Sequence, residues 1–354
     1  MFTLDAFQIT KVPESRLKPG MLDQPVFGQL PTDHMFMANY RNGQWEQGEI
    51  LPFQPIQLSP FTSCLHYAQT VFEGMKAFRM NDGNVNIFRL DRHHTRLELS
   101  LNRMAMPSLP QELFREGILQ LLDLDRNWVP DTEDAALYVR PFVFASEAQV
   151  GAKPANEFLY MVVCFPVVPL FQKAIRVKVE THYRRAAPGG TGAAKCGGNY
   201  AGSFYPTKLA LEQGFQQVIW TDGSPEFHVE ESGTMNLMFV MDGKLVTPPL
   251  SDTILDGITR DSLLHIARAE GIPVEERQIT TAELFEAFEK GILEEAFGAG
   301  TAAVVAPISE IVWDERSINL PSVTANSIQM QLKKSLENIR RGYIEDPFGW
   351  NNIV

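Results

Sequence analysis

The sequence predicts a mixed α/β or α+β protein built from two domains. At 354 residues the chain exceeds the size at which one hydrophobic core usually suffices. Segments that alternate like strands and segments with helical periodicity are interspersed in both halves of the chain. The stretch Val167–Lys173 carries the second proline of an apolar run and interrupts its pattern. We therefore place a connecting loop at 169–175, between an N-terminal domain (1–168) and a C-terminal domain (176–354).

Hairpins of strands, helices and two buried strands are expected in the first domain. The turn signals are Asn42-Gly43 and Asn81-Asp82-Gly83. Ser108-x-x-Gln111 resembles a capping box, with Pro110 in the first turn of the helix. In chain order we expect strands at His34–Tyr40, Leu65–Arg79 and 85–90, a helix from Asp91 to about Arg103, a helix after Ser108, and strands at Ala136–Ser146 and Phe158–Val168.

The second domain has its own turn and cap signals. Asp242-Gly243 marks a hairpin, and Thr280-x-x-Glu283 is a capping box for a helix that ends near Gly291. In chain order we expect a strand at Ile175–Glu180, a helix at Ser203–Gln213, a strand at Gln217–Thr221, the hairpin Asn236–Val246, a helix at Gly257–Gly271, the capped helix, a glycine turn leading into a strand at Phe297–Val305, and a helix at Asn326–Tyr343.

Composition and charge exclude several classes of function. A formal net charge of −12 argues against nucleic acid as a partner, because phosphate neutralisation needs a basic surface. The longest apolar run, Phe158–Phe171, is too short and too interrupted by proline to span a bilayer. The three cysteines and the histidines lack the spacings of a disulfide framework or a metal site. We expect a metal-free protein of the reducing cytoplasm that does not act at a membrane.

The stretch Ala186–Ser203 is the first candidate for chemistry, because it holds one lysine, Lys195, among six glycines. Such a lysine is either solvated on a surface loop or presented to a flat cofactor or a phosphate. The nucleotide-binding pattern G-x-x-x-x-G-K-[ST] fails, since Ala194 precedes the lysine and Cys196 follows it. A Schiff-base role for the amine remains open.

An imine with an aldehyde cofactor would demand partners for a phosphate, a pyridine nitrogen and a substrate carboxylate. Arg89, the helix start Gly257–Thr259 and the small-residue turn Gly298–Ala302 could receive a phosphate or a carboxylate. Glu231 could pair with the pyridine nitrogen. From residue type alone, each also fits an ordinary structural role: a strand-end salt bridge, a capped helix, a tight connection and a solvated loop acid. The hydrolase motif G-x-S-x-G is absent from the sequence.

With these residues assembled, the chain resembles the branched-chain amino acid aminotransferases. The resemblance covers nearly the whole chain and rests on ordered motifs: LHYAQTVFEGMKAFR, IFRLDRHHTRL, LYVRPFVFASE, GGTGAAKCGGNYA, EESGTMN, LDGITRDSLL and EAFGAGTAAVVAPI. It implies the D-amino-acid-aminotransferase-like fold (fold type IV), with a smaller N-terminal α/β domain and a larger C-terminal domain containing a pseudo-barrel. It also implies pyridoxal 5'-phosphate as cofactor and a homodimer with shared active sites.

The resemblance assigns a role to each candidate residue. Lys195 would form the Schiff base and move the substrate proton, and Glu231 would pair with the pyridinium nitrogen. Tyr200 would hydrogen-bond the phenolic oxygen, and Arg185 would support the cofactor indirectly. The phosphate would be held by Arg89, the backbone N–H groups of Ile258 and Thr259, and Thr301. Thr234 and Ala302 would bind the substrate α-carboxylate, and Arg140 would bind the distal carboxylate of glutamate. The side-chain pocket would be lined by Phe27, Tyr138 and Tyr67, of which Tyr67 would come from the second subunit.

The implied reaction is a reversible ping-pong transfer of the amino group of L-leucine, L-isoleucine or L-valine to 2-oxoglutarate. The expected partners are small-molecule amino acids and 2-oxo acids, together with the second subunit of the homodimer, and neither nucleic acid nor a membrane. Two alternatives remain open at this point. One keeps the fold and the cofactor but changes the reaction to that of a D-amino acid aminotransferase or an aminodeoxychorismate lyase. The other is a cofactor-free binding or scaffold protein.

Overall fold

The computed structural model describes residues 7–171 and 173–354, which fall into two compact units. Unit 1 comprises the described part of Met1–Val168 together with Ala194–Gly198 and Ile339–Val354. Unit 2 comprises the described part of Pro169–Ala193 together with Asn199–Asn338. The first six residues of the predicted N-terminal domain and Gln172 of the predicted connecting loop lie outside the described residues.

Two segments that the sequence assigned to the C-terminal domain belong to unit 1. The segment around Lys195 joins unit 1 because Val71 pairs with Cys196 in a β-bridge. The chain end joins it because β19 (Asn351–Ile353) pairs with β7 (Val85–Phe88). Sequence periodicity detects a strand but not its distant partner, so neither assignment was visible in the sequence.

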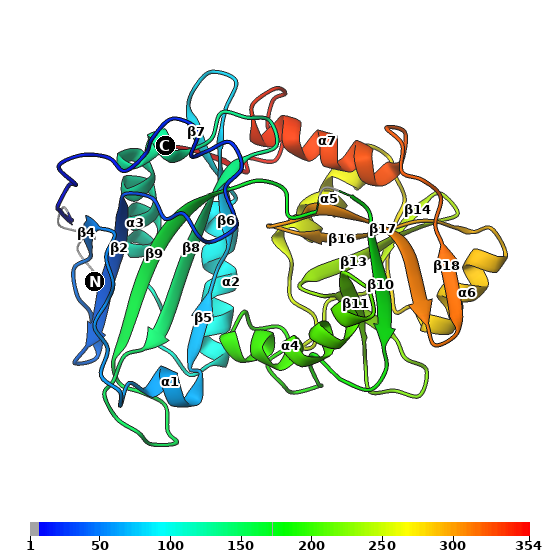
Figure 1. Cartoon of the computed structure of the whole chain (residues 1–354), viewed down its shortest axis with the longest axis horizontal. Helices are drawn as coiled ribbons and strands as arrows, with labels where there is room; N and C mark the ends of the chain where they lie inside the picture. The colour runs from blue at the N-terminus through cyan, green and yellow to red at the C-terminus, as the bar shows by residue number, and fades with distance from the viewer. Residues whose placement is uncertain (1–6, 172) are drawn as a thin grey trace. The chain divides into compact units, whose positions relative to one another are not determined.

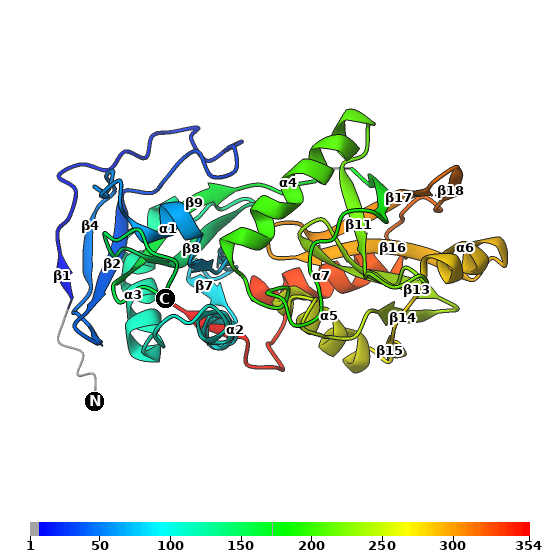
Figure 2. The ribbon, with the colours of Figure 1, turned by 90° about the horizontal axis from the view of Figure 1, so that it is seen from below.

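Unit 1 is a mostly antiparallel sheet with the strand order β1-β4-β2-β9-β8-β6-β7-β19, in which β3 pairs with β2 and β5 pairs with β8. Helices α2 and α3 cover one face of this sheet (Figures 1 and 2). The buried faces of both helices pack with the sheet in one hydrophobic core. The other elements are β1 (Gln8–Ile9), β2 (His34–Arg41), β3 (Gln44–Trp45), β4 (Glu49–Pro52), α1 (Ser63–Tyr67), β5 (Thr70–Phe72), β6 (Met75–Arg79), α2 (Leu90–Arg103), α3 (Gln111–Leu124), the 3-10 turn η1 (Arg126–Trp128), β8 (Ala136–Ala145) and β9 (Phe158–Val167).

Local signals in the first half were mostly sound, and two were wrong. The β2–β3 hairpin turns at Asn42-Gly43, where both residues have positive φ, as predicted. The start of the predicted strand Leu65–Arg79 is instead the end of helix α1, which stops at Ala68 in the left-handed region. The predicted capping box does not form: α3 begins after Pro110 without a side-chain cap. Ser108 Oγ instead donates to Glu98 Oε2 at 2.5 Å, so α2 takes the hydroxyl that was expected to cap α3.

Unit 2 is organised around a closed barrel. Its strands follow the order β12-β11-β10-β17-β16-β13, and a further pairing of β12 with β13 closes a six-strand ring. β14, β15 and β18 extend the sheet, and apolar side chains of the barrel strands and of α6 form a shared core. The elements that lie wholly or mostly in unit 2 are β10 (Ile175–Glu180), α4 (Gly197–Glu212), β11 (Gln217–Thr221), β12 (Val229–Ser232), β13 (Met235–Met241), β14 (Lys244–Thr247), α5 (Ile258–Ala269), β15 (Val274–Glu276), α6 (Thr281–Glu289), β16 (Leu293–Gly300), β17 (Val304–Trp313), β18 (Arg316–Asn319) and α7 (Ile328–Arg340).

The cap of α6 confirms the sequence signal, whereas two glycine-rich segments differ from expectation. Thr280 caps α6 by accepting a hydrogen bond from the Glu283 N–H at 3.0 Å. The helix predicted to start at Ser203 is α4, which already starts at Gly197, so the second half of the lysine stretch is helical. The predicted glycine turn at Phe297 is the end of strand β16, because Asn236 through Phe239 pair with it and hold it extended.

The buried ring of Phe36 makes Gly48 of unit 1 intolerant of a side chain. A Cβ atom at Gly48 would lie 2.2 Å from Cζ of this fully buried ring. Gly48→Ala should therefore lower the free energy of unfolding by about 1–3 kcal/mol, the usual cost of overpacking. Gly151→Ala is the matched control, since its added methyl would meet nothing closer than 3.9 Å. Equal denaturant midpoints for the two variants would contradict this packing.

Candidate active site

The backbone of Lys195 is fixed between α2 and β5 of unit 1. Its N–H donates to Ser100 Oγ at 2.9 Å, and its C=O accepts from the Phe72 N–H at 3.0 Å. The flanking residues Ala194 and Cys196 are buried in the unit 1 core. Hydrogen bonds on both sides of the peptide and buried neighbours leave the residue little freedom, so the amine is presented in a defined direction.

The surroundings of Lys195 favour the neutral amine. Removal from water, helped by the positive charge of Arg96, lowers the pKa of Lys195 to about 8, although Glu73 opposes the shift. The Nζ atom lies 4.9 Å from the centroid of the Phe72 ring. A lysine with a pKa this low has far more neutral amine near neutral pH than an ordinary lysine, and the neutral form can act as a nucleophile and as a general base.

A buried charged cluster lies behind this lysine and was missed by the sequence analysis. Glu73 is fully buried and receives Nε and Nη2 of Arg96, both at 2.7 Å. His93 Nδ1 lies 2.7 Å from the same carboxylate. Burial alone would raise the pKa of Glu73, but Arg96 and His93 hold it well below its usual range. The pairing of Glu73 with Arg96 across 23 residues has no local signature in the sequence.

Predicted pocket residues of unit 1 gather in one aromatic group. The Phe27 and Tyr138 rings meet edge to face, with centroids 5.2 Å apart. The guanidinium of Arg140 lies 4.6 Å above the Phe72 ring and 5.3 Å from that of Tyr138. Tyr138 needs Gly74 beside it, because a Cβ atom there would lie 1.9 Å from the phenolic oxygen. Phe72 belongs to the same group, because the Arg140 guanidinium and the Lys195 amine both lie over its ring, and no motif in the sequence indicates this role.

Two other predicted residues of unit 1 lie in different surroundings. Tyr67 ends α1 with 43% of its surface exposed, and its ring contacts that of His66. Arg89 stands immediately before α2 in the left-handed region, with φ 53°, an uncommon conformation for a residue with a side chain. Its guanidinium lies 4.8 Å from the Trp350 ring, and its N–H donates to the Trp350 carbonyl. The chain end thus positions Arg89, a connection that the sequence did not indicate.

In unit 2, Glu231 is a buried carboxylate surrounded by donors. It lies on β12, and Arg185 Nε approaches its Oε2 to 2.7 Å. Its Oε1 accepts from Asn236 Nδ2 and from the Leu255 N–H, each at 3.1 Å. Arg185 is itself held by the carbonyls of Gly192 and Thr253. An ion pair with this many donors favours an ionised carboxylate despite burial.

A pocket of about 300 Å³, including space open to solvent, opens beside this carboxylate. Tyr200 and Asn199 from the start of α4 line it, and Asn199 exchanges hydrogen bonds with Thr191. The pocket therefore combines an anionic floor, a phenol and several small residues in one unit. Its lining residues are Arg185, Asn199, Tyr200, Ser203, Glu231, Gly233, Thr234 and Leu255.

The predicted anion-binding elements of unit 2 are a helix start and two neighbouring turns. Gly257 precedes α5 without a side-chain cap, so side chains leave the first N–H groups of the helix, including those of Ile258 and Thr259, available to an anion. The turn that carries Thr234 lies against the β16–β17 turn that carries Thr301 and Ala302. A Cβ atom built on Gly300 would lie 3.8 Å from the Thr234 carbonyl oxygen.

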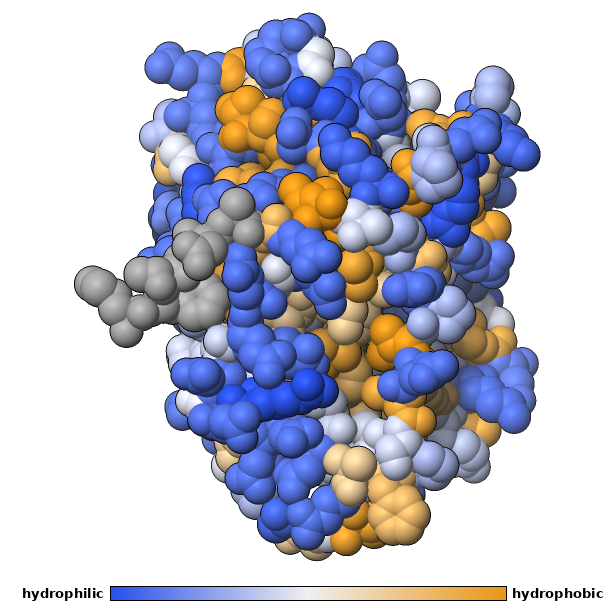
Figure 3. All heavy atoms as spheres, turned by 90° about the vertical axis from the view of Figure 1, so that its left-hand side faces the viewer, coloured by the Kyte–Doolittle hydropathy of each residue, from blue (hydrophilic) through white to orange (hydrophobic). Residues whose placement is uncertain are grey.

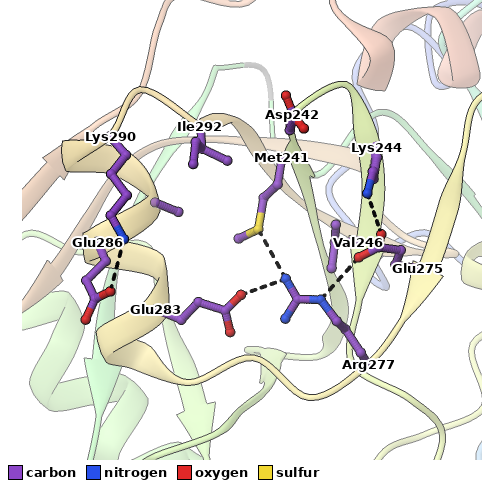
Figure 4. Close-up of a pocket in the computed structure, with 11 residues that line it drawn as sticks. Met241, Asp242, Lys244, Val246, Glu275, Arg277, Glu283, Glu286, Lys290 and Ile292 are labelled. Atoms are coloured by element: carbon purple, nitrogen blue, oxygen red, sulfur yellow. Dashed lines mark hydrogen bonds and ion pairs between the residues drawn. The ribbon is translucent and has the colours of Figure 1, made fainter.

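A second pocket of unit 2 offers no comparable chemistry. It lies between α6 and the β13–β14 hairpin, and Figure 4 shows its lysine, arginine and glutamate side chains paired with one another. Lys244 bonds Glu275 at 2.8 Å, Arg277 bonds Glu283 at 2.6 Å, and Lys290 bonds Glu286 at 3.4 Å. Ion pairs of this half-exposed kind are typical of a solvated surface. Within the described residues, no group of three His, Cys, Asp or Glu side chains could hold a metal ion, and no helix is long and apolar enough to cross a membrane.

Comparison with known proteins identifies the family. The amino-transferase class IV family matches residues 70–311, which contain Lys195, Glu231 and the start of α5. The chain belongs to this family. It is 37% identical to branched-chain-amino-acid aminotransferase 2 of Bacillus subtilis, with 98% of this chain and 96% of the relative covered. It is 41% identical to the branched-chain-amino-acid aminotransferase of Mycobacterium tuberculosis over 94% of this chain and 93% of the relative.

Solved structures of branched-chain aminotransferases have the same fold. The enzyme of Thermoproteus uzoniensis, solved with norvaline, matches with a TM-score of 0.74 and 26% identity over 90% of this chain and 99% of that chain. The T.th. enzyme, complexed with N-(5'-phosphopyridoxyl)-L-glutamate, matches with a TM-score of 0.72 and 27% identity over 89% and 97%. The mixed α/β prediction and the implied barrel are confirmed, and the fold is that of the pyridoxal-phosphate enzymes of fold type IV.

The donor set of this chain fits pyridoxal phosphate. The aldehyde of this cofactor requires an amine, and Lys195 is a buried amine with a pKa of about 8. The ring nitrogen requires a carboxylate, and Glu231 is buried and surrounded by donors. The phosphate requires free N–H groups, which the start of α5 offers because it has no side-chain cap. The cofactor predicted from the sequence is confirmed by the family and its cofactor-bound neighbours. The individual roles of the site residues remain predictions.

Lys195 should titrate well below an ordinary lysine in the cofactor-free protein. Below pH 8 the amine is mostly protonated and unreactive, and above pH 8 it is mostly neutral, given its lowered pKa of about 8. Its carbamylation rate should therefore level off shortly above pH 8. Peptide mass spectrometry measures the rate, with Nα-acetyl-lysine, an amine of pKa about 10.4, as the reference. A rate at Lys195 that keeps rising in parallel with the reference up to pH 10 would disprove the shift.

Proposed function

We propose that this chain transfers the amino group of L-leucine, L-isoleucine or L-valine to 2-oxoglutarate in a reversible ping-pong reaction that uses pyridoxal 5'-phosphate. The observation that carries the proposal is the combination of Lys195 and Glu231 in a chain that is 37–41% identical to branched-chain aminotransferases over most of its length. When bound, the cofactor supplies an aldehyde for amine exchange and a ring that withdraws electrons from the substrate Cα.

The protein's own groups would prepare this chemistry. Lys195 would hold the aldehyde through its amine and would accept the proton from the substrate Cα, because its lowered pKa makes the neutral amine accessible near neutral pH. Glu231, kept ionised by Arg185, holds a proton on the ring nitrogen. Tyr200 donates to the phenolic oxygen. The phosphate is bound by Arg89, Thr301 and the N–H groups of Ile258 and Thr259.

Substrate selection requires a pocket that accepts both an aliphatic chain and a second carboxylate. The Phe27 and Tyr138 rings supply an apolar wall, and Arg140, which contacts Tyr138 Oη at 3.3 Å, is the cation for the distal carboxylate of glutamate. Thr234 and Ala302, on neighbouring turns, are the donors for the α-carboxylate. An arginine that rests on aromatic faces stays stabilised while a leucine side chain occupies the pocket, so neither substrate leaves a bare buried charge.

We also propose a homodimer in the cytoplasm, in which Tyr67 of the partner subunit completes the side-chain pocket. The exposure of Tyr67 and the apolar side chains exposed next to it support an interface at this segment. Apolar side chains also reach the surface among polar ones on the side of unit 1 that carries β2 and β4 (Figure 3). The exposed apolar residues of the Tyr67 segment are Ile56, Leu58, Phe61, Leu65 and Tyr67.

The purified protein should show the visible absorption band of a lysine-bound pyridoxal cofactor. Lys195→Ala should remove both the band and the turnover of L-leucine, because no other amine is predicted to bond the aldehyde. Lys208→Ala is the control, since the side chain of Lys208 is 72% exposed on α4. An unchanged spectrum in Lys195→Ala would exclude the proposed chemistry and favour a binding or scaffold protein.

Donor specificity separates the proposal from its nearest alternative, a D-amino acid aminotransferase with the same fold. With 2-oxoglutarate as acceptor, L-leucine should be the better donor and D-alanine the poorer. Turnover is measured by formation of glutamate. Faster reaction with D-alanine would defeat the branched-chain assignment while leaving the cofactor chemistry intact.

The carboxylate of Glu231 should matter for rate more than for cofactor retention. Glu231→Gln keeps the shape of the side chain but cannot stabilise a protonated ring nitrogen, so the half-reaction with L-leucine should slow by at least about 100-fold. Stopped-flow absorbance measures this rate. Near-normal turnover in Glu231→Gln would remove the residue from its proposed role.

A further inference from the structure

Asn236 contacts Glu231 from the neighbouring strand of the barrel. The two residues are directly paired across β12 and β13, and Asn236 is 5% exposed. Its Nδ2 donates to Glu231 Oε1 at 3.1 Å and to the Leu255 carbonyl at 2.8 Å. The Leu255 N–H donates to the same Glu231 oxygen. Asn236, Glu231 and the Leu255 peptide therefore form a closed ring of three hydrogen bonds.

The other side of the same amide determines how α5 begins. A Cβ atom on Gly257 would lie 1.7 Å from Asn236 Oδ1, so only glycine can occupy this position while the amide keeps its place. Gly257 directly precedes α5, and its carbonyl accepts the first helical hydrogen bond, from the Asp261 N–H. The buried side chain of Asn236 thus fixes the position of the segment Leu255–Gly257, which leads directly into α5.

We infer that Asn236 is a positioning residue that sets the carboxylate of Glu231 and the start of α5 in register with each other. Its Nδ2 orients the carboxylate, and its Oδ1 fixes the position at which the helix begins. The inference rests on the proposed function, in which these two elements bind the ring nitrogen and the phosphate of one rigid cofactor. A rigid ligand with two anchoring points binds tightly only if the protein holds both points at the matching separation.

Removal of the Asn236 amide should weaken cofactor binding and slow the turnover of L-leucine. For Asn236→Ala we expect the pyridoxal phosphate dissociation constant to rise and kcat for L-leucine to fall by about tenfold or more each, while KM changes by less than about twofold. Fluorescence titration of the cofactor-free protein measures the first quantity. Asn319→Ala is the control: Asn319 is exposed on β18 of the same sheet, and its removal should leave both quantities unchanged.

Asn236→Asp removes the Nδ2 donor but keeps the size and shape of the side chain, so it tests the two separately. It keeps the atom that rests on Gly257 but places a second carboxylate beside Glu231. The charged groups around it are Glu231, Arg185, which pairs with Glu231, and Glu230, whose carboxyl interacts with both. Adjacent carboxylates cannot both ionise cheaply, so one stays protonated at low pH and restores a donor. Cofactor affinity relative to wild type should therefore recover on going from pH 9 to pH 6 in Asn236→Asp but not in Asn236→Ala.

A double-mutant cycle tests the link to the helix. Gly257→Ala should weaken cofactor binding strongly in the wild-type background, because the new methyl displaces the amide. It should weaken binding far less in Asn236→Ala, where that space is free, so the two effects should not add. Wild-type affinity in Asn236→Ala, or additive effects in the cycle, would overturn the inference. A wild-type protein that binds no pyridoxal phosphate would instead overturn the proposed function, and the inference with it.

Discussion

The ion pair of Glu231 and Arg185 is the constraint on which the architecture of unit 2 depends. A carboxylate that is 3% exposed would normally become neutral, and only a close cation with further donors keeps it charged. The barrel supplies those donors from three directions: Arg185 follows β10, Asn236 lies on β13, and Leu255 precedes α5. Closure of the ring by the pairing of β12 with β13 places Glu231 opposite Asn236.

In unit 1 the surroundings disfavour a charge instead of stabilising one, since burial lowers the pKa of Lys195. There burial is the main cause of the lowered pKa of Lys195, and the positive charge of Arg96 adds to the shift while the paired Glu73 opposes it. The donors around Glu231 thus favour its charged form, whereas burial favours the uncharged form of the Lys195 amine. Transamination needs this combination, because the ring nitrogen must carry a proton while the lysine must be able to accept one.

Local sequence signals predicted the elements that depend on local chemistry. The strand Gln217–Thr221, the turn at Asn42-Gly43 and the cap at Thr280 follow from alternation, positive φ and a side-chain acceptor, and all three are present. Segments fixed by distant partners were less visible. Ser108 is drawn to Glu98, and the strand end near Phe297 is held extended by pairing with β13.

The candidate site shows the same division. Lys195 stood out because of the glycines around it in the sequence, whereas Glu231 was selected because the chemistry needs a carboxylate and because its motif resembles that of the family. Glu73, Arg96 and Phe72 did not stand out, because they reach Lys195 only through the fold. The glycines around Lys195 also have more varied roles than their number indicated: Gly192 allows close packing on Thr253, whereas Gly197 and Gly198 lie in α4.

The central claim is that the barrel holds an ionised Glu231 against a protonated ring nitrogen. It is tested most directly by ¹⁵N NMR of the protein reconstituted with pyridoxal phosphate labelled at that nitrogen. The account predicts the chemical shift of a protonated pyridine throughout pH 6–9, without a titration step. The shift of an unprotonated pyridine nitrogen at neutral pH in the wild-type protein would contradict it.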